Sequence, residues 1–238
     1  MIAAGDVDLP RPLRDDGDVN IPDQLAAEAR RDGARPFLTW YDDATGERIE
    51  LSVTTLANWA VKTANALSSE YALEPGGAVR LTPADHWLSF VLALGAWTMG
   101  ARVDLDDRDH VPVALPGDPA EFTDTVLPQP DAPTTPPASP VAAALRVAGR
   151  TWAADALAAA AQRAASMHEV GPGARILSTM ALDSLTGMDA SLLIPLVAAG
   201  SVVFVANHDP DRLADRARME RVTFTAGCAV PGLPRLDS

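Results

Sequence analysis

Apolar residues recur along the chain in two series of elements that share the same order. In the first series, residues 54–106, apolar positions from Leu56 to Leu67 are spaced by three and four residues, which predicts an amphipathic helix. A Pro-Gly turn ends this helix, and Ala78–Thr82 predicts a short strand. The apolar segment Trp87–Met99 predicts a second helix, and Ala101–Leu105 predicts a second strand.

The second series, residues 150–206, repeats this order. An alanine-rich helix is predicted first, then a strand at Arg175–Thr179, an apolar helix at Ala190–Ala199 and a strand at Ser201–Ala206. Parallel strands need long crossover connections, so helices that alternate with strands indicate parallel sheets. The pattern predicts an α/β fold with two related, doubly wound, mainly parallel βαβ subdomains.

Shorter elements flank the two series. Ahead of the first, Ile21–Ala29 predicts a helix, and Arg35–Tyr41 with Glu47–Leu51 predicts a β-hairpin. After the second, Arg221–Thr225 predicts a last strand.

A proline-rich connection separates the two series. Residues 111–140 contain nine prolines, which lack an N–H donor and fix their own φ, so we expect an irregular surface connection with one short element at Glu121–Leu127. We therefore divide the chain into a flexible N-terminal segment (1–20), a first α/β subdomain with the helix and hairpin (21–110), this connection (111–140) and a second α/β subdomain (141–238).

Composition narrows the choice of partners. The net charge of -13 disfavours nucleic acid and anionic membranes, because both repel an acidic protein. A single cysteine, Cys228, excludes an intramolecular disulfide framework and suits a buried apolar position. The N-terminus shows no secretion signal, and the longest apolar stretch, Ala190–Ala206, is interrupted by Pro195 and Gly200. We therefore expect a cytoplasmic protein without membrane insertion.

Polar residues follow several predicted strands, at the edge where open α/β sheets bind ligands. The candidate ligand cleft comprises Thr82, Asp85, His86, Asp104, Asp106, Ser178, Thr179, Asp183 and Ser184. Helix capping is an alternative role for several of them, with Asp85 and Asp183 expected to cap the helices that follow. No Gly-x-Ser-x-Gly motif surrounds Ser178 or Ser184, which argues against a hydrolase.

The acidic run Asp104–His110 has two interpretations. Its carboxylates are suitable ligands for a divalent cation or for a metal-dependent nucleotide-sugar site. A solvated acidic loop is the alternative, and it is common on a surface this acidic. We assign no metal and no cofactor to the chain.

Several short motifs follow one another along residues 21–231. They are Pro36-Phe37-Leu38, Ile49-Glu50-Leu51-Ser52, Leu73-Glu74-Pro75-Gly76-Gly77-Ala78-Val79, Leu94-Gly95-Ala96-Trp97-Thr98-Met99-Gly100-Ala101 and Pro195-Leu196-Val197-Ala198-Ala199-Gly200. This series resembles the N-terminal part of the adenylate-forming superfamily, the AMP-binding acyl-CoA synthetases, adenylation domains and luciferases. The resemblance implies two related doubly wound subdomains, as the repeat does.

The phosphate loop of that superfamily has no counterpart here. The resemblance implies a loop rich in Ser, Thr and Gly, ending in lysine, just before the strand predicted at Leu145–Gly149. Leu127–Pro140 stands there instead, rich in proline and without glycine or lysine. A phosphate cradle presents successive backbone N–H groups at a turn that glycine adopts easily. Thr134, Thr135 and Ser139 offer hydroxyls without that frame.

We therefore expect a truncated, catalytically inactive relative of these enzymes that acts as a regulatory or interaction protein, with a protein partner or as a homo-oligomer. Two alternatives remain open. The chain could bind an acyl group, CoA or a nucleotide between the two series without turning it over. It could also be one half of a split adenylating enzyme whose phosphate loop comes from another polypeptide.

Overall fold

A computed structural model describes residues 20–81, 84–106, 113–114, 119–139 and 142–236. The flexible segment predicted at residues 1–20 lies outside this part of the chain, apart from Asn20. The described strands form two five-stranded sheets, in the orders β10-β8-β9-β1-β2 and β5-β3-β4-β6-β7. Their bounds are β1 (Pro36–Asp42), β2 (Arg48–Ser52), β3 (Ala78–Arg80), β4 (Arg102–Asp104), β5 (Val113–Ala114), β6 (Ala143–Val147), β7 (Arg150–Ala153), β8 (Arg175–Ser178), β9 (Ser201–Ala206) and β10 (Phe224–Ala226).

Each sheet combines three parallel strands from one half of the chain with a hairpin from the other half. The N-terminal hairpin β1–β2 joins the later sheet, where Leu38 of β1 lies opposite Val202 of β9 in parallel register. The hairpin β6–β7 joins the earlier sheet, where Leu145 of β6 lies opposite Val103 of β4. The predicted α/β class with mainly parallel sheets is confirmed. Strand pairing nevertheless crosses the expected division into residues 21–110 and 141–238, because each part supplies two strands to the other part's sheet.

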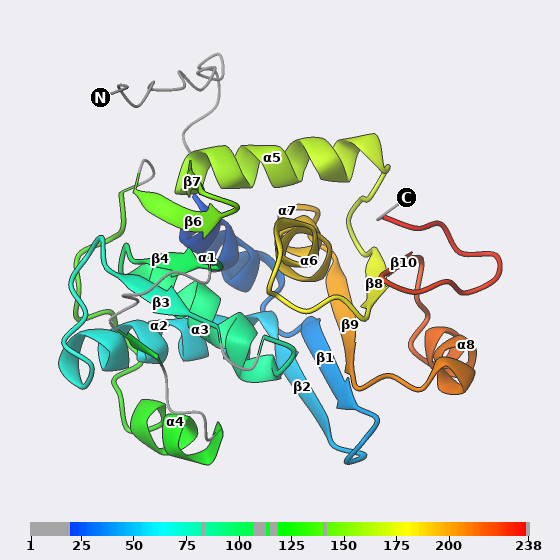
Figure 1. Cartoon of the computed structure of the whole chain (residues 1–238), viewed down its shortest axis with the longest axis horizontal. Coiled ribbons are helices and arrows are strands. Elements are labelled where there is room, and N and C mark those ends of the chain that lie inside the picture. Colours follow the sequence, from blue (N-terminus) through cyan, green and yellow to red (C-terminus); the bar gives the residue numbers. More distant parts are fainter. Residues whose placement is uncertain (1–19, 82–83, 107–112, 115–118, 140–141, 237–238) are drawn as a thin grey trace, which may run out of the picture.

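Helices fill the space between the sheets and cover their outer surfaces (Figure 1). Their bounds are α1 (Ile21–Asp32), α2 (Val53–Ser69), α3 (Trp87–Thr98), α4 (Pro119–Val126), α5 (Ala154–Met167), α6 (Leu185–Met188), the π-helical turn η1 (Asp189–Leu193), α7 (Ile194–Val197) and α8 (Pro210–Met219). None of these described helices combines the length and apolar character needed to cross a membrane.

Helix α3 lies between the two sheets and is apolar on all sides. All ten residues from Leu88 to Trp97 are buried, as expected for a helix surrounded by protein. Its Phe90 packs edge-to-face against Phe204 of β9, with ring centroids 5.4 Å apart, so a helix of the first series contacts the sheet of the second. Gly95 permits close packing on α2, because a Cβ atom there would lie only 2.5 Å from Cγ2 of Thr63. The two sheets thus share one hydrophobic core.

Helix α8 is absent from the sequence-based prediction because its buried apolar face is short, with Leu213 and Ala217, and is joined by a buried arginine. The guanidinium of Arg216 donates to both oxygens of Asp43, at 2.7 and 3.0 Å, and lies over the ring of Tyr41. Both charged side chains are almost fully buried. The strand predicted at Arg221–Thr225 is shifted to Phe224–Ala226. The residues between the end of α8 and Phe224 include the turn that follows the helix.

The proline-rich connector, defined here as residues 127–139, lies along α2. Lys62 donates through Nζ to the carbonyl oxygens of Leu127 and Gln129, at 3.0 and 2.5 Å, and pairs with Asp131 at 3.2 Å. One turn further, buried Asn65 holds the connector with four hydrogen bonds. They join Asn65 Nδ2 to the carbonyl oxygens of Pro130 and Ala132 at 3.0 Å each, and Asn65 Oδ1 to the backbone N and Oγ1 of Thr134 at 2.9 and 2.8 Å.

This arrangement follows from the chemistry of proline. A segment rich in proline has carbonyl acceptors but few N–H donors, so its acceptors need donors from elsewhere. Lys62 is the only lysine of the chain, and with Asn65 it supplies those donors from one face of α2. The described residues 127–139 are mostly exposed, and α4 lies close to the short element expected at Glu121–Leu127.

The connector ends at the amino edge of the β3–β4 sheet. Gly76 donates through its backbone N to the carbonyl of Gly100 at 2.8 Å, which brings together the residues that precede β3 and β4. A Cβ atom on Gly100 would lie 3.6 Å from the Cβ atom of Ala138. From this edge the chain enters β6, which runs parallel to β4.

The predicted apolar helix at Ala190–Ala199 begins earlier and contains an irregularity. It consists of α6, η1 and α7 in succession. Asp189 opens the π-helical turn, and its Oδ1 atom is buried without a hydrogen-bond partner among the described residues. Burial raises the pKa of Asp189 to about 6, because the charged form is poorly solvated there.

We expect Asp189→Asn to stabilise the protein near neutral pH. Since the native state binds a proton more readily than the unfolded chain, the unfolding free energy of the natural protein should rise as pH falls from about 7 to about 4. The variant removes the buried charge, so it should be more stable at about pH 7, by up to about 3 kcal/mol, and should lose this part of the pH dependence. Urea denaturation across that range measures both effects. A variant less stable than the natural protein at pH 7 would contradict the assignment, and exposed Asp124→Asn is the matched control.

We expect Asn65→Asp to release the connector. The carboxylate would place oxygen atoms against the carbonyls of Pro130 and Ala132, where the amide now donates, and leave buried acceptors unpaired. The free energy of unfolding, measured in urea, should fall by about 3 kcal/mol. Asn58→Asp makes the same change on an exposed position of α2 and should cost less than about 0.5 kcal/mol. Equal effects of the two substitutions would show that Asn65 does not hold the connector.

Candidate functional site

The loops that follow β3 and β8 meet in a crevice between the two sheets. Leu182 donates its backbone N–H to the carbonyl of Ala84 at 3.0 Å, so the two loops are joined directly. Trp40 of the N-terminal hairpin donates through Nε1 to the carbonyl of Asp85 at 2.8 Å, and its ring lies 5.0 Å from that of His86. These loops occupy equivalent positions in the two series and lie at the carboxyl ends of parallel strands, as the sequence predicted.

Two of the predicted cleft residues line one small pocket. Asp104 of β4 and Asp183 of the loop after β8 border it with Arg80, Leu81 and Leu105, around a volume of about 190 Å³. Typical small-molecule sites enclose about 300–1,000 Å³, so the pocket that the described residues border is smaller than such sites. One oxygen of Asp104 accepts a hydrogen bond from the backbone N of Asp106 at 3.1 Å, and the other lies 3.6 Å from Arg102 Nε.

The caps of the two following helices lie one residue later than expected. His86, not Asp85, caps α3, because its Nδ1 accepts from the backbone N of Leu88 at 3.2 Å. Ser184, not Asp183, caps α6 through Gly187 N at 3.1 Å. Burial lowers the pKa of His86, so its imidazole is neutral when it accepts this bond.

Ser178 and Thr179 are engaged in holding the strands together. The Ser178 hydroxyl is buried 2.8 Å from that of Ser191 and accepts from the backbone N of Met180 at 3.1 Å. Thr179 donates its N–H to the carbonyl of Ala226 at 3.1 Å. Ser178 is therefore part of the packing between β8 and η1. Thr82 lies outside the described residues.

Asp106 turns away from the crevice toward the β6–β7 hairpin. Its Oδ2 accepts from the backbone N of Gly149 at 2.9 Å and from Arg146 Nε at 3.2 Å. The bond from Gly149 is the main cause that lowers the pKa of Asp106, and the Ala148 amide and Arg146 add to it. Ala148 and Gly149 both have positive φ, so the turn points its N–H groups at one internal carboxylate.

The described residues contain no cluster of three or more His, Cys, Asp or Glu side chains suited to a metal ion. Most of the acidic run Asp104–His110, from residue 107 onward, lies outside them.

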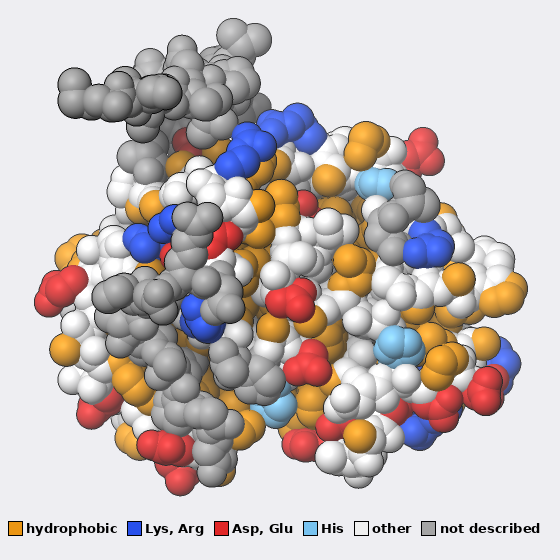
Figure 2. Space-filling view, in the orientation of Figure 1, with side chains coloured by type: hydrophobic (Ala, Val, Ile, Leu, Met, Phe, Trp, Pro, Cys, Tyr) orange, Lys and Arg blue, Asp and Glu red, His pale blue; other side chains and the backbone are white. Residues whose placement is uncertain are grey.

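Figure 2 shows acidic side chains scattered over one face of the molecule, with basic side chains between them. Sequence reasoning missed Trp40 and Arg80, because Trp40 reaches the crevice only through the hairpin exchange and Arg80 lies within a strand.

Comparison with solved structures shows where this fold recurs. The N-terminal domain of FACL13 from Mycobacterium tuberculosis superposes with a TM-score of 0.75 at 12% identity, covering 88% of this chain and 62% of that one. The nonribosomal peptide synthetase FmoA3 in its AMPPNP-bound form gives 0.70 at 19% identity, covering 87% of this chain and 25% of that one. A fatty acyl-adenylate ligase from L. pneumophila, in complex with acyl adenylate and pyrophosphate, gives 0.70 at 11% identity, covering 87% and 44%.

These likenesses concern the fold alone, and the chain spans less than two thirds of each of these structures. The expected similarity to the N-terminal domain of adenylate-forming enzymes is confirmed at that level. No protein-family model matches the sequence. A TIGR03089 family protein of Mycobacterium tuberculosis (strain ATCC 25618 / H37Rv) is 35% identical over 236 residues, with 82% of this chain and 92% of that protein covered. The chain therefore belongs to the TIGR03089 family.

Proposed function

We propose that this protein is a catalytically inactive relative of the adenylate-forming enzymes, and that it acts as a regulatory or interaction protein. The observation that carries the proposal is the position of Lys62. The only lysine of the chain is fixed on α2 by two connector carbonyls and by Asp131, and its side chain is 20% exposed.

The charge of the crevice supports the same proposal. Adenylation requires cations and hydrogen-bond donors positioned where negative charge develops on the transferred phosphate. Among its described lining residues, the small pocket in the crevice presents the carboxylates of Asp104 and Asp183 beside one arginine, Arg80. Two carboxylates would repel a triphosphate at the edge of the sheets where a nucleotide would have to bind.

Two backbone donors near this edge are also in use. The N–H groups of Ala148 and Gly149 point toward Asp106, which occupies the position that an external anion would take at such a turn. The connector contributes carbonyl oxygens to α2 and ends at the opposite edge of the sheet. Neither segment offers a triphosphate a row of free N–H groups.

The interaction role rests on a fold without a phosphate loop and not on an exposed apolar patch. Among the described residues, Met167 at the end of α5 and Met219 at the end of α8 are 75% and 71% exposed, and Leu127 beyond α4 is 52% exposed. They lie at or beyond the ends of three different helices, and single exposed apolar residues are normal on a protein surface. A partner protein or a second copy of the chain is the occupant that we propose.

We expect the purified chain to show no acid-dependent exchange of pyrophosphate into ATP, tested with magnesium and a panel of short, long and aromatic carboxylic acids. Lys62→Met should leave this result unchanged and should lower the free energy of unfolding by about 1–3 kcal/mol, because two connector carbonyls lose a charged donor. Exchange that the natural chain supports and Lys62→Met abolishes would refute the proposal. Exchange that requires an added second polypeptide would favour the split enzyme instead.

A further inference from the structure

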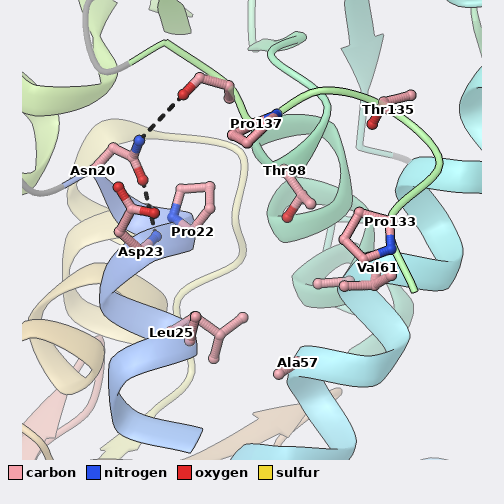
Figure 3. Close-up of a pocket in the computed structure, with 13 residues that line it drawn as sticks. Asn20, Pro22, Asp23, Leu25, Ala57, Val61, Thr98, Pro133, Thr135 and Pro137 are labelled. Carbon is pink, nitrogen blue, oxygen red and sulfur yellow. Dashed lines mark hydrogen bonds between the residues drawn. The ribbon is translucent and has the colours of Figure 1, made fainter. Parts of the chain in front are cut away.

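A second and larger pocket lies on the helical side of the molecule, away from the crevice. It has a volume of about 460 Å³ and opens between α1 and α2, with the end of α3 beside it and the connector across it (Figure 3). This volume falls within the range of small-molecule sites, unlike that of the crevice pocket.

Small side chains on facing helices create this space. Ala26 on α1 faces Ala57 and Ala60 on α2, so the two helices leave room that larger residues would fill. The connector passes over the gap with Pro133 and Pro137 on its inner side (Figure 3). It is held at one side by the four hydrogen bonds of Asn65 described above, and at the other by Asn20 Nδ2, which lies 3.5 Å from the carbonyl of Ala138. The pocket is therefore preformed, which lowers the conformational cost of binding.

The lining combines apolar walls with a few oxygen acceptors. Thr98 donates its hydroxyl to the carbonyl of Leu94 at 2.8 Å, and Asn20 Oδ1 accepts from the backbone N of Asp23 at 2.9 Å, so both already have partners. Within the described part of the chain, the carboxylate of Asp23 and the hydroxyl of Thr135 have no hydrogen bond. Asn20, Pro22 and Asp23 lie together at the start of α1, on one side of the pocket (Figure 3).

Charge distinguishes between classes of ligand, although weakly. Asp23, exposed in the first turn of α1, is the one charged residue among the described lining residues, and the whole chain carries -13. A fatty acid, CoA or a nucleotide would bring further negative charge to this carboxylate, and none of the described lining residues is a cation that would offset it. An apolar molecule with an ammonium group would instead place its hydrocarbon part against the alanine and proline walls and its charge near Asp23. We infer that this pocket binds a small apolar amine.

Three probes of similar size and different charge test the inference. They are 2-phenylethylamine, 2-phenylethanol and 3-phenylpropanoate. Each is titrated at millimolar concentration into the full-length protein, which is labelled with 13C at its methyl groups and uniformly with 15N. We expect the amine to shift the methyl signals of Ala26, Ala57 and Val61, and to bind at least about threefold more tightly than the carboxylate. The alcohol should shift the same signals with intermediate affinity.

Two variants test whether the probes bind in this pocket and whether the Asp23 carboxylate contributes to binding. Ala57→Leu should weaken the binding of all three probes, followed on the methyl signals of Ala26 and Val61, because the added carbons occupy part of the pocket. Asp23→Asn should weaken the amine about two- to fivefold and leave the alcohol unchanged, whereas Asp124→Asn on exposed α4 should affect neither. The inference is overturned if the carboxylate binds as tightly as the amine, if Asp23→Asn does not weaken the amine, or if no probe shifts these methyl signals in the natural protein. If Ala57→Leu does not fold, the comparison of the three probes still decides the matter.

Discussion

A chain segment that contains many prolines has more backbone hydrogen-bond acceptors than donors. In this molecule, the side chains that supply the missing donors determine where the connector lies. Residues 127–139 obtain their missing donors from Lys62 and Asn65, which lie three residues apart on one face of α2. This contact fixes the connector on the helices, directs it to the amino edge of a sheet and makes it one wall of an apolar pocket. The same contact engages the chain's single lysine in structure.

The exchange of hairpins explains why two similar halves form one body. Each sheet takes its last two strands from the other half, so neither sheet is complete when only one half is folded. The crevice forms where the halves meet, with Trp40 of one hairpin bonded to the loop after β3 of the other sheet. The fold is that of the N-terminal domain of acyl-CoA ligases and adenylation domains, whereas His86 and Ser178, which follow or end strands at the crevice, are engaged in a helix cap and a strand contact.

Local periodicity predicted the elements whose stability comes from apolar packing. The helices α2 and α3 and the strands β8 and β9 agree with the expected positions because buried residues recur there at regular intervals. Helix α8 escaped prediction since its anchor is the buried pair Arg216–Asp43. The hairpin exchange and the pocket beside α1 could not be predicted either, because both depend on contacts between residues far apart in sequence. A polar stripe of Lys62, Asn65 and Ser69 on α2 was the available signal for the connector contact.

The central claim is that neither the connector nor the turn at Ala148 and Gly149 offers a row of free backbone N–H groups to a triphosphate. Amide chemical shifts of the 15N-labelled protein, followed during titration with magnesium ATP, test it most directly. The account predicts that the amide signals of the connector and of Ala148 and Gly149 stay unchanged through millimolar nucleotide, since those segments have fixed internal contacts. Saturable shifts confined to these amides would mean that they grip the phosphates, and would contradict the account.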